Sequence, residues 1–275
     1  MISAIQRLED GTINLTITIP WTRVEDTKKT VVDELAKEVE LPGFRKGKAP
    51  KKVVESAVDK EKVRDEILKK LLPQTYLEAT SEHKLNPIVT PLIHVGAIDE
   101  GKDWQYTAQT CEAPQVELGS YKENVKKVTA KSKIAIPGKE PQPASFEDIT
   151  KELLKSVKVK IPKIVIEREV QRLLSQTLDE IKRLGLTLDQ YLQSTGKTSE
   201  SLRSDYEEKA SNDIKIEFAL QEIAEEEKIT VSDSEINNAI KKAKNDDERK
   251  NLEANRYLLA SVIRQQKTLE FLKNL

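Results

Sequence analysis

Apolar and polar residues alternate in two stretches at the start of the chain, a period that is typical of β-strands. The stretches cover residues 2–8 and 12–19, and the polar residues 9–11 between them end in a glycine, which favours a tight turn. Two further strand-like stretches, over residues 88–98 and 104–110, also have a polar segment between them. The sequence therefore predicts two β-hairpins.

Between the hairpins the apolar residues recur at intervals of three and four, which predicts two helices. The first helix should end before Pro42-Gly43, because neither residue continues a helix well. The second should begin near Pro50 and break or kink at Pro73, with more helix up to about Lys84. Strands and helices together predict an α+β domain over residues 1–115.

Residues 116–145 differ in composition from the segments on both sides. Lysine, proline and small residues dominate, and Pro137, Pro141 and Pro143 lie close together. Proline stiffens the chain, and too few apolar residues are present to build a core. This stretch is therefore predicted to be an extended linker.

Beyond the linker the apolar spacing is helical throughout, over residues 146–275. Ser145, Thr187 and Ser232 each precede an acidic residue or a glutamine by three positions, a spacing typical of a capped helix start. Three apolar stripes predict faces that pack against partner helices in an antiparallel array. The stripes are Ile166, Val170, Leu173, Thr177, Ile181 and Leu184; Leu202, Tyr206, Ala210, Ile214 and Phe218; and Leu259, Val262, Ile263, Leu269 and Leu272. The predicted fold class is α+β, an N-terminal α+β domain joined by an extended linker to an all-α helical domain.

Composition agrees with long solvated helices. Charged residues make up 34% of the chain and aromatic residues 4%, unlike a compact enzyme with an aromatic pocket. The 46 basic and 47 acidic residues nearly balance, so no overall field attracts nucleic acid, DNA included, and any basic contact surface must come from a local cluster. Cys111 is the only cysteine, which excludes an internal disulfide and fits a reducing compartment. Without a signal-like start or a membrane-length apolar run, the sequence predicts a cytoplasmic protein with no membrane contact.

Residues that could carry catalysis lack the surroundings that catalysis needs. His83 and His94 are the only histidines, and neither has a second ligand at a metal-binding spacing. The acidic pair Glu207-Glu208 lies in a heavily charged helical segment that should face water. No Gly-x-Ser-x-Gly motif occurs in the chain. The sequence therefore predicts no catalytic residue, no metal and no cofactor.

One loop stands out between the two N-terminal helices. Its residues 43–52 contain five cationic residues and no acid, which makes a local positive surface. Glycines allow a tight loop that projects Phe44 and Arg45, a pair suited to a crevice where the guanidinium meets a carboxylate or phosphate. The alternative interpretation is an ordinary connection between helices with solvated charges.

The pattern Gly-Phe-Arg-x-Gly-x-x-Pro in this loop resembles the ribosome-binding signature of the trigger factor family. The matching residues are Gly43, Phe44, Arg45, Gly47 and Pro50. Residues 113–121 are similar to the segment that closes the first domain of that family. Residues 160–163 are similar to the entry into its helical domain. Two later stretches, over residues 185–192 and 229–236, are similar to recurring stretches of that same domain.

The resemblance implies a ribosome-associated chaperone. It implies that the loop docks near the exit tunnel, on ribosomal protein and rRNA, and that the helical domain forms a cradle for nascent and unfolded polypeptides. The resemblance leaves open whether the protein forms a homodimer away from the ribosome. The residues implied in docking are Gly43, Phe44, Arg45, Lys46, Gly47, Lys48 and Pro50.

The chain departs from the usual family plan in one respect. An isomerase domain of the FK506-binding type normally lies between the two family domains, but only the short interval 122–145 occupies that place. This interval is too short for a domain and has no aromatic residues to line a pocket, so isomerase activity is not carried over. Two alternatives stay open: a peptidyl-prolyl isomerase of this family, and a helical scaffold for one dedicated partner. The scaffold would leave the loop unexplained.

Overall fold

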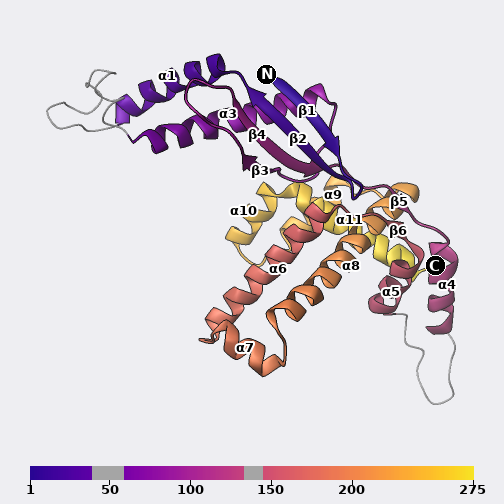
Figure 1. Ribbon diagram of the computed structural model, residues 1–275. Helices are drawn as coiled ribbons and strands as arrows, with labels where there is room; N and C mark the ends of the chain where they lie inside the picture. The colour runs from indigo at the N-terminus through magenta and orange to yellow at the C-terminus, as the bar shows by residue number, and fades with distance from the viewer. Residues whose placement is uncertain (39–58, 133–144) are drawn as a thin grey trace. The chain divides into compact units, whose positions relative to one another are not determined.

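A computed structural model describes residues 1–38, 59–132 and 145–275 (Figure 1). The chain divides into two compact units. The α+β unit contains Met1–Ala113 and Pro162–Val165, and the helical unit contains Pro114–Ile161 and Ile166–Leu275. The predicted fold class, an α+β domain joined to an all-α helical domain, is confirmed.

The α+β unit contains a four-stranded antiparallel sheet with strand order β1-β2-β4-β3. The strands are β1 (Ile2–Arg7), β2 (Thr12–Ile19), β3 (Leu92–Val95) and β4 (Trp104–Cys111). Gly11 turns the first hairpin with φ +88°, and the Asp10 carboxylate accepts a hydrogen bond from the Thr12 amide at 3.0 Å. Both predicted hairpins are confirmed, although β3 is shorter than the predicted stretch 88–98.

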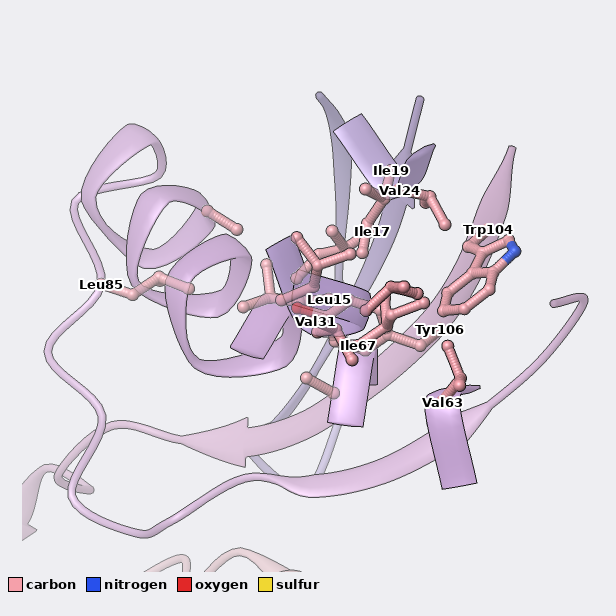
Figure 2. Close-up of a cluster of buried hydrophobic side chains, with 14 of the residues drawn as sticks. Leu15, Ile17, Ile19, Val24, Val31, Val63, Ile67, Leu85, Trp104 and Tyr106 are labelled. Carbon is pink, nitrogen blue, oxygen red and sulfur yellow. The ribbon is translucent and has the colours of Figure 1, made fainter. Parts of the chain in front are cut away.

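Two helices cover one face of this sheet, α1 (Trp21–Glu38) and α3 (Lys60–Glu82). Alternate residues of β2, from Ile13 to Ile19, are buried, as the period of two requires. Figure 2 shows Leu15, Ile17 and Ile19 beside Val31 and Ile67 of the two helices. The hydrophobic core of the unit therefore lies between the sheet and the helix pair.

Pro73 does not break α3, which continues for nine residues beyond it to Glu82. A break of the helix at this proline is therefore wrong, whereas the predicted continuation of helix to about Lys84 is confirmed. Leu71, Thr75 and Ala79, at intervals of four around it, are 1% exposed or less. This continuous buried face offsets the hydrogen bond that proline removes.

The helical unit includes residues of the stretch that was predicted to be an extended linker. Val116–Glu117 form β5, which pairs with β6 (Lys158–Val159), and Tyr121–Ser132 form α4. Because Tyr121 and Val125 are 2% and 0% exposed, four positions apart, they give α4 a buried face. The linker prediction is therefore wrong for these residues, and its part at 133–144 lies outside the described residues.

α4 packs against α5 (Phe146–Ser156) and the C-terminal elements. The Tyr121 hydroxyl donates a hydrogen bond to Glu227 at 3.2 Å, and Lys122 forms an ion pair with Glu226 at 3.2 Å. Residues distant in the sequence bury the apolar face of α4, which the composition of residues 116–145 did not predict. The buried residues of this core are Leu118, Tyr121, Val125, Ile149, Leu153, Val157, Ala219, Leu220, Ile223 and Leu272.

The other helices follow the predicted order. They are α6 (Lys163–Arg183), α7 (Leu188–Thr195), α8 (Ser199–Glu226), α9 (Asp233–Lys241), α10 (Asp246–Ala254) and α11 (Arg256–Lys273). The side chains of Ser145, Thr187 and Ser232 cap α5, α7 and α9, which confirms the capping predictions. Thr198, which the sequence analysis did not single out, caps α8 in the same way.

The apolar stripes are buried only in part. Val170, Ile181 and Ile214 are buried as predicted, whereas Leu184 is 71% exposed and Val262 is 42% exposed. α6 ends at Arg183, so Leu184 lies just beyond the helix. The next residue, Gly185, has φ +71° and turns the chain away from the helix axis. The apolar periodicity of the α6 sequence includes one residue beyond the end of the helix, and the burial predicted for this residue, Leu184, is wrong.

Candidate functional site

The loop residues singled out by the sequence lie outside the described residues. These residues are Gly43, Phe44, Arg45, Lys46, Gly47, Lys48 and Pro50. Their role in binding therefore stays a prediction. The structure describes the two helices to which this segment is joined, α1 and α3.

The pair of α1 and α3 is held together by buried side chains and by ion pairs. Arg23 donates two hydrogen bonds of 2.7 Å to Glu78, and Lys70 pairs with Glu34. Hydrogen bonding from Arg23 lowers the pKa of the Glu78 carboxyl. These pairs are partly exposed, so each adds on the order of 0.2–1 kcal/mol to a core that already fixes the helices. The helices next to the loop are thus rigidly attached to the sheet, as an element that presents a binding loop should be.

Exposed leucines gather where α6 ends and α7 begins. Leu184 is 71% exposed, Leu186 40% and Leu188 37%. The Leu186 amide donates a hydrogen bond to the Ile181 carbonyl at 3.1 Å, which holds the connection in a compact turn. Several exposed leucines within a few residues form an apolar surface, a feature that marks contact sites on proteins.

A second apolar surface is a groove of about 370 Å³ between α8 and α11. Leu220 and Ala224 of α8, Val231 of the following segment, and Tyr257 and Ala260 of α11 line it. Tyr257 is 91% exposed, and the neighbouring Leu258 is 64% exposed. The groove combines a small apolar floor with a large aromatic side chain at its edge.

Polar contacts fix the segment that forms one wall of this groove. The Arg264 guanidinium donates to the Ile229 carbonyl at 3.0 Å, and the Lys267 ammonium donates to the Thr230 carbonyl at 2.6 Å. Lys267 also donates to Glu235 at 2.8 Å. This bond, together with those from Ser232, lowers the pKa of Glu235 to about 2. The groove is therefore preformed, while its exposed aromatic edge can adapt.

Among the residues that the structure describes, no cluster of histidine, cysteine, aspartate and glutamate is arranged to hold a metal ion. His83 lies 3.0 Å from the Ser3 hydroxyl, and His94 pairs with Thr107 in the sheet. Burial raises the pKa of the Tyr106 hydroxyl to about 12, so this group stays protonated. The exposed leucines and the groove offer apolar side chains for contact with another chain.

Sequence reasoning did not single out Tyr257 and Leu258. Both precede the apolar stripe of α11, and periodicity alone does not distinguish a contact residue from a core residue. No local signal in the sequence marks them, because Asn255, which precedes α11, is a residue type that commonly caps helices. In the structure, however, α11 begins at Arg256 without a side-chain cap, so two large apolar residues stand in an uncapped first turn, where a helix end has few partners.

In the part of the chain that the structure describes, no helix combines the length and the apolar character that a membrane span requires.

Comparison with protein families matches the chain in two adjacent regions. Residues 1–136 match the family described as bacterial trigger factor protein, and residues 139–274 match the bacterial trigger factor C-terminus. Only residues 137 and 138 separate the matched regions, so no isomerase domain lies between them.

Curated relatives match part of the chain. The trigger factor of Natranaerobius thermophilus is 34% identical over 122 residues, which are 44% of this chain and 27% of that protein. The trigger factor of Moorella thermoacetica is 32% identical over 121 residues, with the same shares. The matched segment thus spans about a quarter of the length of these relatives.

A solved structure has the same fold over almost the whole chain. It comes from work on promiscuous substrate recognition in the folding and assembly activities of the trigger factor chaperone. The match has a TM-score of 0.65 and 15% identity, and it covers 98% of this chain and 99% of the other. The fold is thus that of a two-unit chain in which an α+β unit is joined to a helical unit. With both family regions present in order, the chain belongs to the trigger factor family.

Proposed function

We propose that this protein is a ribosome-associated chaperone that binds nascent and unfolded polypeptides and assists their folding. The observation that carries the proposal is the match of both trigger factor regions, over residues 1–136 and 139–274, in one chain. The exposed apolar side chains of the helical unit support it, because a surface of this kind suits contact with unfolded segments.

The docking element is the loop that contains Phe44, Arg45 and Lys46. Its five cations without an acid attract the negative charge of rRNA and of acidic protein surfaces, and Phe44 supplies an apolar anchor. The partner surface in this proposal lies near the exit tunnel and includes ribosomal protein and rRNA. Attachment of the loop to α1 and α3 gives it a firm base in the α+β unit.

The client-binding elements are the leucines around Leu186 and the groove beside Tyr257. An unfolded chain presents apolar side chains in no fixed order, so a useful partner makes many weak contacts and needs no single shaped pocket. The two surfaces offer apolar atoms beside exposed polar groups, which suits release as well as binding. Such binding would shield clients from aggregation while they fold.

Chaperone action here proceeds by binding without catalysis, in the cytoplasm. The isomerase alternative is not favoured, because the two family regions adjoin at residues 136–139. A direct test measures the rate of prolyl isomerisation in a short peptide in the presence of the protein. Without catalysis, this isomerisation takes tens to hundreds of seconds. A rate that rises in proportion to the protein concentration would restore the isomerase alternative. Analytical ultracentrifugation of the free protein tests the homodimer.

The decisive experiment is co-sedimentation with ribosomes. Phe44→Ala/Arg45→Ala/Lys46→Ala should stay folded and lose most of its association, and added salt should weaken the wild-type association because exposed charges are screened over about 8–10 Å. The matched control, Phe146→Ala/Arg203→Ala/Lys209→Ala, removes the same three residue types from exposed positions in the helical unit. If the loop variant sediments as well as this control, the docking proposal is wrong.

A further inference from the structure

The α+β unit contains a pocket that the proposed function does not use. It has a volume of about 240 Å³ and lies between α1, the first turns of α3, and the connection from β3 to β4. Apolar side chains form its walls, with Trp21 of α1 and Trp104 of β4 among them. Both helices and the sheet position these residues through the core of the unit, so the pocket is built by rigid elements.

The floor of the pocket is apolar and deeply buried. Val24 is 0% exposed, Ile67 3% and Trp104 5%. The Trp104 indole donates a hydrogen bond to the Asp99 carbonyl at 3.1 Å, which fixes the ring in its orientation. Figure 2 shows the Trp104 ring beside Val24 and Val63. A buried apolar floor with a fixed aromatic ring favours a large apolar side chain as occupant.

The rim of the pocket is cationic. Lys28, Lys60 and Arg64 line it, against one carboxylate, Glu100. Lys28 forms an ion pair with Glu100 at 3.1 Å, whereas Lys60 and Arg64 form no ion pair with any other residue that the structure describes. The hydrogen bond from Lys28, followed by the charges of all three cations, lowers the pKa of the Glu100 carboxyl. The rim therefore has an excess of positive charge.

We propose that this pocket binds a segment of unfolded polypeptide in which a large apolar side chain lies next to acidic residues. The apolar side chain enters between Trp21 and Trp104, and the neighbouring carboxylates meet Lys60 and Arg64. The inference rests on the proposed function, because it adds a client contact in the α+β unit to the two in the helical unit, and it assigns a preference among clients.

The size of the pocket supports a side chain of a longer segment over a separate small molecule. Pockets for whole ligands of drug size measure about 300–1,000 Å³, and this one measures about 240 Å³. It has room for one anchoring side chain, the usual centre of a protein contact. Charge on the rim then selects which segments anchor there, because like charges at close range oppose binding.

Tryptophan fluorescence gives a direct test, since the chain contains two tryptophans and both line the pocket. The probe is a short synthetic peptide with a central Leu-Phe pair and aspartates on both sides, added to the full-length protein. Binding should change the tryptophan emission. A second peptide with lysines in place of the aspartates should bind about tenfold more weakly, and salt should reduce this difference.

A variant with reversed charge at the rim tests whether the cations contribute to peptide binding. Lys60→Glu/Arg64→Glu changes two exposed residues and should weaken binding of the acidic peptide by about tenfold or more. The matched control is Lys62→Glu/Lys69→Glu, which makes the same change of charge at exposed positions of the same helix, away from the pocket. A second variant, Ile98→Phe, fills the pocket while leaving the rim charges intact, and it should also weaken binding.

The outcomes separate this inference from the proposed function. If the acidic peptide binds equally to wild type and to Lys60→Glu/Arg64→Glu, or if only a single-stranded RNA oligomer changes the tryptophan emission, the pocket proposal is wrong. Suppression of aggregation of a client without acidic segments should be the same in wild type and in the rim variant. If the wild type itself fails to suppress aggregation, the proposed chaperone function is wrong, whatever the peptide does.

Discussion

The two units of this protein bury apolar side chains in different ways. In the α+β unit, alternate residues of β2 from Ile13 to Ile19 are 1% exposed or less and belong to one continuous core. In the helical unit, the core is concentrated in α4, α5, the second half of α8 and the end of α11. α10 has no buried residue, and Leu184 and Tyr257 are 71% and 91% exposed.

The difference follows from the geometry of strands and helices. A strand places every second side chain on the same face, so one covered face buries the whole set. A helix presents a stripe that is buried only where a partner lies, and its ends extend beyond that partner. Under the proposed function, the sheet-based unit therefore suits docking in one fixed geometry, and the helical unit suits contacts that vary from client to client.

The largest expected effect separates a core leucine from an exposed one. Leu15→Ala removes a side chain that is 0% exposed and should lower the stability of the α+β unit by about 2–5 kcal/mol. Leu184→Ala, at a position 71% exposed, should change stability by less than about 0.5 kcal/mol. Denaturant unfolding followed by tryptophan fluorescence measures Leu15→Ala, because Trp21 and Trp104 both lie in the α+β unit. Denaturant unfolding followed by circular dichroism, which also reports on the helical unit, measures Leu184→Ala. Equal effects would contradict the difference in burial.

The next effect tests whether α4 belongs to the helical core. Val125→Ala, at a position 0% exposed, should destabilise the helical unit by about 1–3 kcal/mol. Lys126→Ala, the control at the exposed neighbouring position, should have little effect. Thermal unfolding followed by circular dichroism measures both. If Val125→Ala leaves the transition unchanged, residues 121–132 do not contribute to this core.

A smaller effect concerns the exposed apolar side chains. Tyr257→Ser/Leu258→Ser should reduce the suppression of client aggregation by about half without lowering stability, since both side chains are largely exposed. Ile2→Ser/Leu77→Ser makes a similar change in the α+β unit, at positions 73% and 67% exposed, and should leave suppression intact. Light scattering of an unfolding client is the measurement. Equal losses in both variants would remove the functional distinction between the units.

The smallest effect is a pH dependence in the helical unit. The pKa of Glu235 is about 2 in the folded protein, below the ordinary value of 4.5, so its ionised form stabilises the fold. That contribution is present above about pH 5 and is lost as the pH falls toward about 2. Glu235→Gln should therefore reduce the loss of thermal stability between about pH 5 and pH 3, whereas Glu253→Gln, at an exposed position, should not. Identical acid profiles for Glu235→Gln and wild type would contradict this role.

Much of the fold could be predicted from the sequence because its signals are local. The alternation in β2 and the turn at Gly11 determine the first hairpin. Capping residues such as Thr187 and Ser232 determine helix starts, since the capping bonds form within one turn. The motif that includes Phe44 and Arg45 could also be recognised from the sequence, because its residues lie within one short segment, and it carried the family resemblance.

Other features were decided only by tertiary structure, because they depend on partners distant in the sequence. α4 forms a helix in a stretch of poor local signal because Ile149, Ile223 and Leu272 bury its apolar face. Leu184 continues a periodic stripe yet is exposed, because α6 has already ended. Trp21 and Trp104 are far apart in the sequence, and the fold brings them into one pocket with a cationic rim. Periodicity predicts which face of an element is apolar, and the packing of the whole chain decides whether that face is buried or left exposed to bind.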